Sequence, residues 1–154
     1  MKKLKAAVIG VGGISNEHIN GYIKNENVDL YAFCDINEKQ LKYMSEKYDI
    51  PAERCFTDKD EMLKALPEID IVSVCTWNAA HAECTIAALN AGKDVICEKP
   101  MAMNTQQAEE MRAEAEKQGK LLMVGFVMRF SDESRIALDL INDGALGDIY
   151  YSKG

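Results

Sequence analysis

Three glycines lie close together near the N-terminus, directly after a short apolar run. Gly10, Gly12 and Gly13 follow the run Ala6–Ile9 and precede a segment whose apolar residues have helical spacing. At a turn from strand to helix, Gly10 would allow a tight bend and Gly12 would let the backbone approach a diphosphate. The free N–H groups of the helix N-terminus would attract that anion. The third small position of the pattern holds Ser15. The predicted binding residues of this turn are Gly10, Gly12, Gly13 and Ile14.

An acidic residue follows the second apolar run. Asp35 ends the run Val28–Cys34 and lies about 20 residues beyond the glycines, the spacing of a ribose-binding carboxylate. A carboxylate there accepts a hydrogen bond from a ribose 2′-OH and repels a 2′-phosphate. Because no Arg follows Asp35 in the next three residues, we predict NAD rather than NADP. The alternative is that Asp35 only begins a turn with Asn37.

The tripeptide Glu98-Lys99-Pro100 directly follows another apolar run, Asp94–Cys97. Open parallel sheets bind ligands beyond the carboxyl ends of their strands. At such a place the Lys99 ammonium could hydrogen-bond a reacting hydroxyl and stabilise negative charge that develops on its oxygen. Spacing alone favours a surface lysine before a turn proline, so the catalytic interpretation depends on the other motifs. We also predict that the Lys99–Pro100 peptide bond is cis.

Strand-like and helix-like segments alternate through the chain. Helices are expected to begin at Asn37, with Gln40 at the capping-box position, at Thr57 or Asp58, and at Asn104 or Thr105, and to end at Gly92 and Gly119. Alternation at this spacing predicts an α/β fold, a doubly wound parallel sheet of the Rossmann type, with right-handed crossovers. The expected strands are 4–9, 28–34, 54–56, 69–75, 94–97, 121–127 and 147–152, and the expected helices are 14–25, 38–47, 60–65, 80–90, 105–118 and 131–142.

Length predicts a single domain. A chain of 154 residues buries roughly two-thirds of its extended surface, which is enough for a substantial core. We expect residues 1–154 to form a dinucleotide-binding domain. Because the last expected strand begins where the chain ends, we expect about 145–154 to be the truncated start of a second domain. An exposed strand there would favour self-association through its edge.

Composition narrows the function classes. The net charge of −7 argues against a broad nucleic-acid-binding surface. With two histidines and no Cys-x-x-Cys pair, we expect no metal site, and we interpret the five cysteines as reduced thiols of a cytoplasmic protein. The apolar start is short and broken by glycines, so it is interpreted as a strand rather than a signal peptide. No apolar run approaches the ~20 residues of a membrane span.

The chain resembles the Gfo/Idh/MocA oxidoreductases, a family named for glucose–fructose oxidoreductase and inositol dehydrogenase. The run AGKDVICEKPMA at 91–102 is similar to the family signature around its Glu-Lys-Pro. The similar motifs continue in the same order on both sides of it, and the resemblance covers the whole chain. These further motifs are the glycine turn, Thr76-Trp77-Asn78 with His81, the run 124–130 that contains Arg129, and the run 144–149.

The resemblance implies a domain that binds NAD or NADP within a protein that transfers a hydride between nicotinamide and a hydroxyl-bearing carbon of a sugar or cyclitol. It implies that Lys99 is catalytic and that Pro100 shapes the turn beside the nicotinamide. The family's second domain supplies an Asp and a His for proton transfer, and neither has a counterpart here. We therefore expect the 154-residue chain to bind dinucleotide weakly and to show no detectable turnover. The further implied cofactor-binding residues are Thr76, Trp77, Asn78, His81, Glu98, Lys99, Pro100 and Arg129.

Several alternatives remain at this point. The chain could be a non-catalytic NAD-binding or sensing module that is complete as it stands. A methyltransferase that uses S-adenosylmethionine also has a glycine-rich turn and a following acidic residue, but Ile14 stands where its turn usually has Gly. His81 either supports the cofactor loop or packs its own helix, and Arg129 either faces the nicotinamide side or is solvated. Trp77 replaces the Pro that many relatives have between Thr and Asn.

Overall fold

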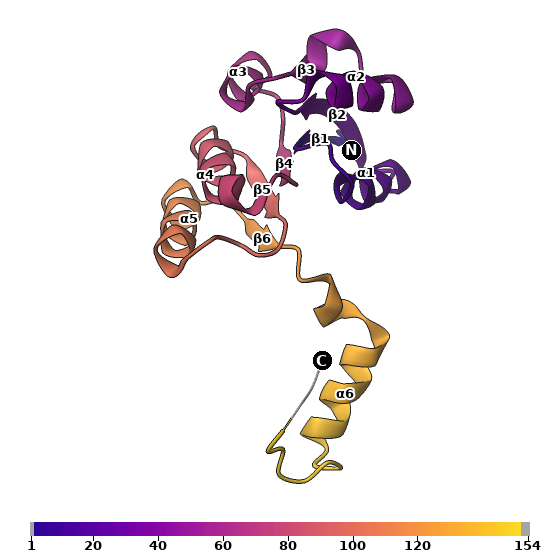
Figure 1. The fold of residues 1–154 in the computed structure, drawn as a ribbon, viewed down its shortest axis with the longest axis vertical. Helices are drawn as coiled ribbons and strands as arrows, with labels where there is room; N and C mark the ends of the chain where they lie inside the picture. Colours follow the sequence, from indigo (N-terminus) through magenta and orange to yellow (C-terminus); the bar gives the residue numbers. More distant parts are fainter. Residues whose placement is uncertain (1, 152–154) are drawn as a thin grey trace.

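A six-stranded parallel sheet with helices on both faces forms the body of the molecule, in a computed structural model that describes residues 2–151 (Figure 1). The predicted α/β class and doubly wound sheet are confirmed. The strands are β1 (Leu4–Ile9), β2 (Val28–Cys34), β3 (Cys55–Phe56), β4 (Ile71–Val74), β5 (Asp94–Cys97) and β6 (Leu122–Val124). The helices are α1 (Ser15–Lys24), α2 (Glu38–Lys47), α3 (Lys59–Ala65), α4 (His81–Asn90), α5 (Thr105–Gln118) and α6 (Asp132–Asn142), with 3₁₀ turns at Ala52–Arg54, Asn78–Ala80 and Val127–Phe130.

The strand order is β3-β2-β1-β4-β5-β6. The chain builds outward from β1 to β3, then crosses back and builds outward again from β4 on the other side. The carboxyl ends of β1 and β4 therefore lie beside each other at the topological switch point, where such sheets bind ligands. Backbone hydrogen bonds continue past the strands here, since Gly10 N donates to Cys34 O and Cys75 N donates to Ile9 O, each at 2.8 Å.

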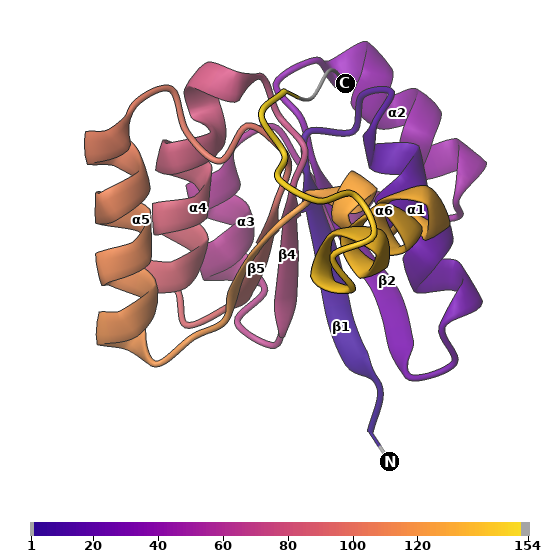
Figure 2. The same cartoon turned by 90° about the horizontal axis from the view of Figure 1, so that it is seen from below.

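Two apolar layers hold the helices against the sheet. Helices α3, α4 and α5 cover one face and α1 and α2 cover the other, as Figure 2 shows. Alternate residues of the strands supply the two layers, because successive side chains of a strand point to opposite faces. Val72 and Met111 belong to the first layer, and Phe33, Ile19 and Met44 belong to the second.

Local side-chain chemistry sets the helix ends as predicted. Asn37, Asp58 and Asn104 each accept hydrogen bonds from backbone N–H groups of the following turn, and Gly119 ends α5 with φ +62°. One detail differs from the expected capping box on α2. The Gln40 side chain does not bond back to Asn37 but donates to Val11 O at 2.7 Å. This contact ties α2 to the glycine turn.

The sixth strand is shorter than the predicted 121–127. Gly125 N donates the last ladder bond, to Cys97 O at 2.8 Å, and the chain then turns into a 3₁₀ helix. Met123, in the middle of β6, is 59% exposed. Its side chain points to the face of the sheet opposite Leu122, and α5 covers only the Leu122 face.

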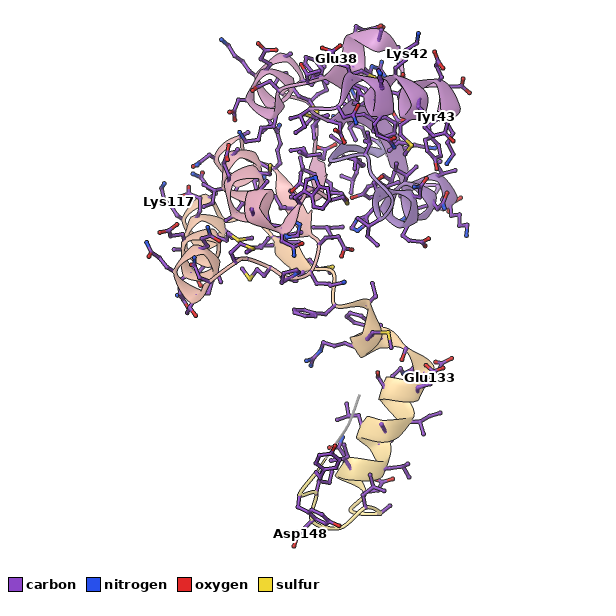
Figure 3. The ribbon with its side chains drawn as sticks, viewed as in Figure 1. Glu38, Lys42, Tyr43, Lys117, Glu133 and Asp148 are labelled. Carbon is purple, nitrogen blue, oxygen red and sulfur yellow. The ribbon has the colours of Figure 1, made fainter. Side chains whose placement is uncertain are left out.

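Beyond β6 the chain leaves the sheet. Helix α6 lies apart from the sheet body in Figure 1, and Figure 3 shows Glu133 and Asp148 on this segment, away from Lys117 on α5. The strand predicted at 147–152 is wrong for the described part, because 147–151 contain no strand; Ser152 lies outside the described residues. A strand forms only where its backbone pairs with a neighbour, and the described sheet offers no partner there. The expected edge for self-association is therefore not formed up to Tyr151.

None of the described helices combines the length and apolarity needed to cross a membrane.

Candidate functional site

A cleft of about 530 Å³ opens at the carboxyl ends of β1, β2 and β4. It lies at the switch point of the sheet, between the glycine turn, the end of β2 and the loop after β4. A wider groove of about 620 Å³ lies beside α2, but it is lined by none of the predicted site residues. The predicted residues that line the cleft are Gly10, Gly12, Gly13, Asp35, Thr76 and Trp77.

The glycine turn leaves space and hydrogen-bond donors toward the cleft. A Cβ atom at Gly12 would meet nothing within 4 Å. Among residues 2–151, the backbone N–H groups of Gly12 and Gly13 make no hydrogen bond. Ser15 is fully buried behind the turn, and its hydroxyl donates to Gly12 O at 2.6 Å. Ser15 thus fills the third small position and also braces the turn. The open space and the unused donors fit an anion such as a diphosphate.

Asp35 is fixed at the end of β2 by two backbone donors. Its Oδ2 accepts from Val11 N and its Oδ1 accepts from Asn37 N, both at 2.8 Å. The second bond forms the turn between Asp35 and Asn37, which was the alternative interpretation of Asp35. The first bond joins the end of β2 to the glycine turn across the sheet. Because each carboxylate oxygen has a second lone pair, Asp35 can still accept from a ribose hydroxyl in the cleft.

Charged residues at the N-terminus of α3 line the same cleft. Asp58 caps α3, and the hydrogen bond from Glu61 N is the main cause that lowers the Asp58 pKa. Lys59 Nζ lies 2.7 Å from Glu83 Oε1 and 3.1 Å from Asp60 Oδ2. The hydrogen bond to Glu83 is the main cause that raises the Lys59 pKa. The one cationic side chain among the cleft-lining residues is therefore already paired with carboxylates.

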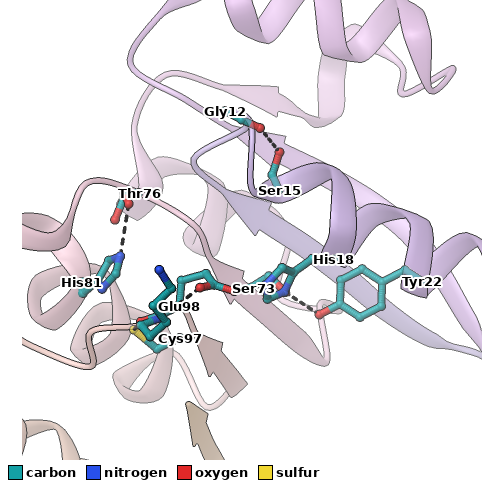
Figure 4. Close-up of polar contacts among 10 residues, drawn as sticks. Gly12, Ser15, His18, Tyr22, Ser73, Thr76, His81, Cys97 and Glu98 are labelled. Carbon is teal, nitrogen blue, oxygen red and sulfur yellow. Dashed lines mark hydrogen bonds and ion pairs between the residues drawn. The ribbon is translucent and has the colours of Figure 1, made fainter. Parts of the chain in front are cut away.

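The loop after β4 carries Trp77 into the open, with 85% of its surface exposed. His81 lies behind this loop and is almost fully buried. Its Nε2 lies 3.1 Å from Thr76 O (Figure 4). Its Nδ1 lies 2.7 Å from Pro100 O. Both partners are carbonyl oxygens, so a neutral ring donates its single N–H to one of them and only contacts the other. His81 thus connects the loop after β4 with the Glu-Lys-Pro turn as well as packing its helix.

The Glu-Lys-Pro turn lies at the same carboxyl edge of the sheet but does not line the cleft. The Lys99–Pro100 peptide bond is cis, as predicted. Glu98 is buried whereas Lys99 and Pro100 are exposed. Arg129 is exposed in the 3₁₀ turn that leads away from the sheet. The predicted site residues outside the cleft lining are Ile14, Asn78, His81, Glu98, Lys99, Pro100 and Arg129.

Two features of the site were missed from the sequence. Lys59 and Glu83 close one side of the cleft. His18, on α1, contacts Glu98 at 3.0 Å. The only sequence signal for His18 is its place one turn after Ser15, close to the buried face that Ile19 marks. Among residues 2–151, no group of side chains could hold a metal ion.

Three thiols line the cleft and are poor nucleophiles. Burial raises the pKa of Cys34 and of Cys75 to about 12, and that of Cys84 to about 11. At pH 8 a thiol with a pKa near 12 is ionised to about one part in ten thousand. Cys97 is buried and Cys55 is half-buried.

Iodoacetamide at pH 8 is therefore expected to label Cys55 first, since only thiolates react and Cys55 is the most accessible thiol. The other four cysteines are expected to react only after unfolding in urea. Mass spectrometry of peptides from a time course checks this order. Rapid labelling of Cys34 or Cys75 in the folded chain would contradict the burial described here.

The strand order, the glycine turn and the acidic residue after β2 define a dinucleotide-binding Rossmann domain. Residues 4–126 match the Gfo/Idh/MocA model, described as an oxidoreductase family with an NAD-binding Rossmann fold. The chain belongs to this family, and the predicted resemblance is confirmed.

Individual relatives are longer than this chain. The chain is 38% identical over 148 residues to D-glucoside 3-dehydrogenase of Escherichia coli (strain K12), which covers 96% of this chain and 41% of that protein. It is 31% identical over 144 residues to myo-inositol 2-dehydrogenase of Thermotoga maritima, with 94% and 42% covered. A crystal structure of scyllo-inositol dehydrogenase from Lactobacillus casei with bound NAD(H) and scyllo-inositol has a TM-score of 0.85 at 28% identity, covering 96% of this chain and 43% of that one. The chain thus spans about two fifths of the length of these relatives.

Proposed function

We propose that the cleft at the switch point binds NAD, with the diphosphate on the glycine turn and the adenosine ribose at Asp35. One observation carries this proposal. The hydrogen bond from Val11 N to Asp35 Oδ2 joins the glycine turn to the end of β2, so both predicted binding elements border one cleft. The open space at Gly12 and the unused N–H groups beside it support the same assignment.

The charges around the cleft support NAD over NADP. The carboxylate of Asp35 would lie beside a 2′-phosphate and repel it. A cation could offset that repulsion, but Lys59 is already paired with Glu83 and Asp60. The relative from Lactobacillus casei with NAD(H) bound adds independent support for the same cofactor.

A titration that follows Trp77 fluorescence tests this function. Trp77 is the only tryptophan of the sequence and borders the cleft. NADH is expected to quench it saturably and to bind at least about tenfold more tightly than NADPH, because a buried or partly buried charge repulsion is worth a kcal/mol or more. Calorimetry of both cofactors provides a second readout that does not depend on fluorescence. Absence of saturable binding of either cofactor would refute the proposal.

Asp35→Asn is expected to narrow the preference for NADH over NADPH to about threefold or less, since it removes the repelling charge and keeps the side-chain shape. The preference is a ratio measured on one variant, so any loss of folded protein cancels. Glu38→Gln is the matched control, because Glu38 is an exposed carboxylate three residues away that lies outside the cleft. An unchanged ratio in Asp35→Asn would remove Asp35 from the cofactor preference.

We further propose that the whole protein transfers a hydride between nicotinamide and a hydroxyl-bearing carbon of a sugar or cyclitol. When bound, NAD supplies the hydride chemistry, and the protein orients the reactants. Lys99 is exposed at the carboxyl edge of the sheet, where its ammonium can hydrogen-bond a substrate hydroxyl and stabilise charge on its oxygen. The names of the relatives, a glucoside dehydrogenase and an inositol dehydrogenase, support the substrate class.

Formation of NADH from NAD⁺ by the whole protein, with myo-inositol and with alkyl D-glucosides, tests the reaction. Turnover with either class supports the proposal. Cofactor binding with no turnover on any sugar or polyol would instead favour the non-catalytic NAD-binding module.

A further inference from the structure

A series of hydrogen bonds leads from α1 past β4 to the end of β5, as Figure 4 shows. Tyr22 Oη lies 2.7 Å from Ser73 Oγ, and Ser73 Oγ lies 2.9 Å from His18 Nδ1. His18 Nε2 lies 3.0 Å from Glu98 Oε1. These four side chains come from α1, β4 and the residue after β5. They are buried or nearly so, and His18 and Glu98 have 11% and 7% of their side chains exposed.

The available protons decide which group donates in each of these hydrogen bonds. A neutral His18 donates from Nε2 to the Glu98 carboxylate and accepts at Nδ1 from the Ser73 hydroxyl. Ser73 then accepts from the Tyr22 hydroxyl, and every donor in the chain has an acceptor. Burial raises the pKa of Tyr22, which keeps its hydroxyl protonated. This tautomer is assigned from the hydrogen bonds themselves.

The combination of Ser, His and Glu does not form a hydrolytic triad here. Ser73 is fully buried in β4, and its oxygen is already bonded to both Tyr22 and His18. A nucleophile needs a site beside it for the reacting atom. The chain of hydrogen bonds therefore has a structural consequence, which lies at its Glu98 end.

Glu98 is held on three sides. Its Oε1 faces His18, and its Oε2 accepts from the backbone N–H of Lys99 at 3.0 Å. Gly125 closes the third side, because a Cβ atom there would lie 2.8 Å from Glu98 Oε1. The same carboxylate thus bonds to α1 and to the peptide group of the lysine that follows it. The direction in which the chain leaves β5 at Lys99 depends on this carboxylate.

We propose that His18 is a positioning residue that fixes the Glu98-Lys99-Pro100 turn relative to the glycine turn. Both turns are attached to α1, because Ser15 bonds to Gly12 O one helical turn before His18 bonds to Glu98. The helix thereby sets the spacing between the diphosphate end and the nicotinamide end of the cofactor site. This inference rests on the proposed function, in which Lys99 bonds the reacting hydroxyl, so that the nicotinamide must also reach this turn.

The test compares NADH with ADP-ribose, which shares the diphosphate and adenosine but lacks the nicotinamide. Calorimetry at one pH gives the affinities of NADH and of ADP-ribose for the unchanged protein and for His18→Leu. His18→Leu is expected to weaken NADH about tenfold and to change ADP-ribose by less than about twofold, since only the nicotinamide end is misplaced. His18→Gln can donate to Glu98 and accept from Ser73, so it is expected to restore NADH binding to within about threefold.

Asn20→Leu is the matched control, because Asn20 is an exposed residue of the same helix. It is expected to change neither affinity. If His18→Leu does not fold, as judged by thermal unfolding, Glu98→Gln is the second variant and is expected to show the same selective loss of NADH.

The outcomes separate the inference from the proposed function. Equal losses of NADH and ADP-ribose in His18→Leu, or no loss of either, would overturn the positioning role. A wild-type chain that binds neither ligand would refute the proposed function and the inference with it. A wild-type chain that binds ADP-ribose as tightly as NADH would keep the diphosphate site but refute the nicotinamide end.

Discussion

Gly10→Ala is expected to destabilise the fold by about 3–5 kcal/mol, which is a large part of the stability of a typical domain. Gly10 has φ +86°, a conformation that costs a side chain free energy. A Cβ atom there would also lie 2.7 Å from the backbone C and O of Cys75. That neighbour cannot move away, because Cys75 N is bonded to Ile9 O in the ladder between β1 and β4. Urea unfolding followed by circular dichroism measures the loss.

Gly21→Ala is the matched control for this change. Gly21 lies in the exposed face of α1, and a Cβ atom there would meet nothing within 4 Å. Because glycine is a poor helix former, this variant is expected to gain about 0.5–1 kcal/mol. If the free energy of unfolding of Gly10→Ala lay within about 1 kcal/mol of that of the unchanged chain, the close contact between the glycine turn and β4 would be wrong.

Helix ends were predicted well because their causes are local. Asn37, Asp58 and Asn104 bond to N–H groups two or three residues away, and Gly119 ends α5 through its own φ. All the information for such a contact lies within one short stretch of sequence. The doubly wound parallel sheet could be predicted because short crossovers of one hand leave few ways to arrange alternating strands and helices.

Strand lengths at the edge of the sheet were predicted poorly because pairing is not local. The run 121–127 is apolar throughout, but β6 extends only as far as β5 offers a partner. The run 147–151 has strand-like residues and no strand beside it. Met123 is exposed for a related reason, since burial of a strand residue depends on which face a helix covers.

The site was predicted in part, and the division has the same origin. Residues within three positions of a strand end, such as Asp35 and Trp77, could be placed at the cleft because parallel strands end at one edge. The contact between His18 and Glu98 joins residues 80 positions apart. It requires both the packing angle of α1 and the register of β4 and β5, neither of which a single sequence specifies.

Gly12→Ala is expected to leave the fold intact and to weaken NADH binding about a hundredfold or more, which corresponds to about 2.7 kcal/mol. No atom lies within 4 Å of a Cβ at this position, and Gly12 does not have a positive φ. The folded chain therefore accepts the methyl group. The bound diphosphate does not, because the backbone of Gly12 must come into contact with it. In the proposed function, the open space at Gly12 is the space that the ligand requires.

Two measurements on the same samples separate this effect from that at Gly10. The free energy of unfolding in urea is expected to stay within about 1 kcal/mol of that of the unchanged chain for Gly12→Ala, whereas Gly10→Ala loses stability. Calorimetry with NADH is expected to show normal binding by Gly21→Ala and weak binding by Gly12→Ala. Unchanged NADH affinity in Gly12→Ala would place the diphosphate elsewhere, because a methyl group within a close backbone contact cannot be accommodated without displacing the ligand. In the proposed function the two glycines, two positions apart, serve different needs: Gly10 permits the strands to approach each other, and Gly12 permits the cofactor to approach the strands.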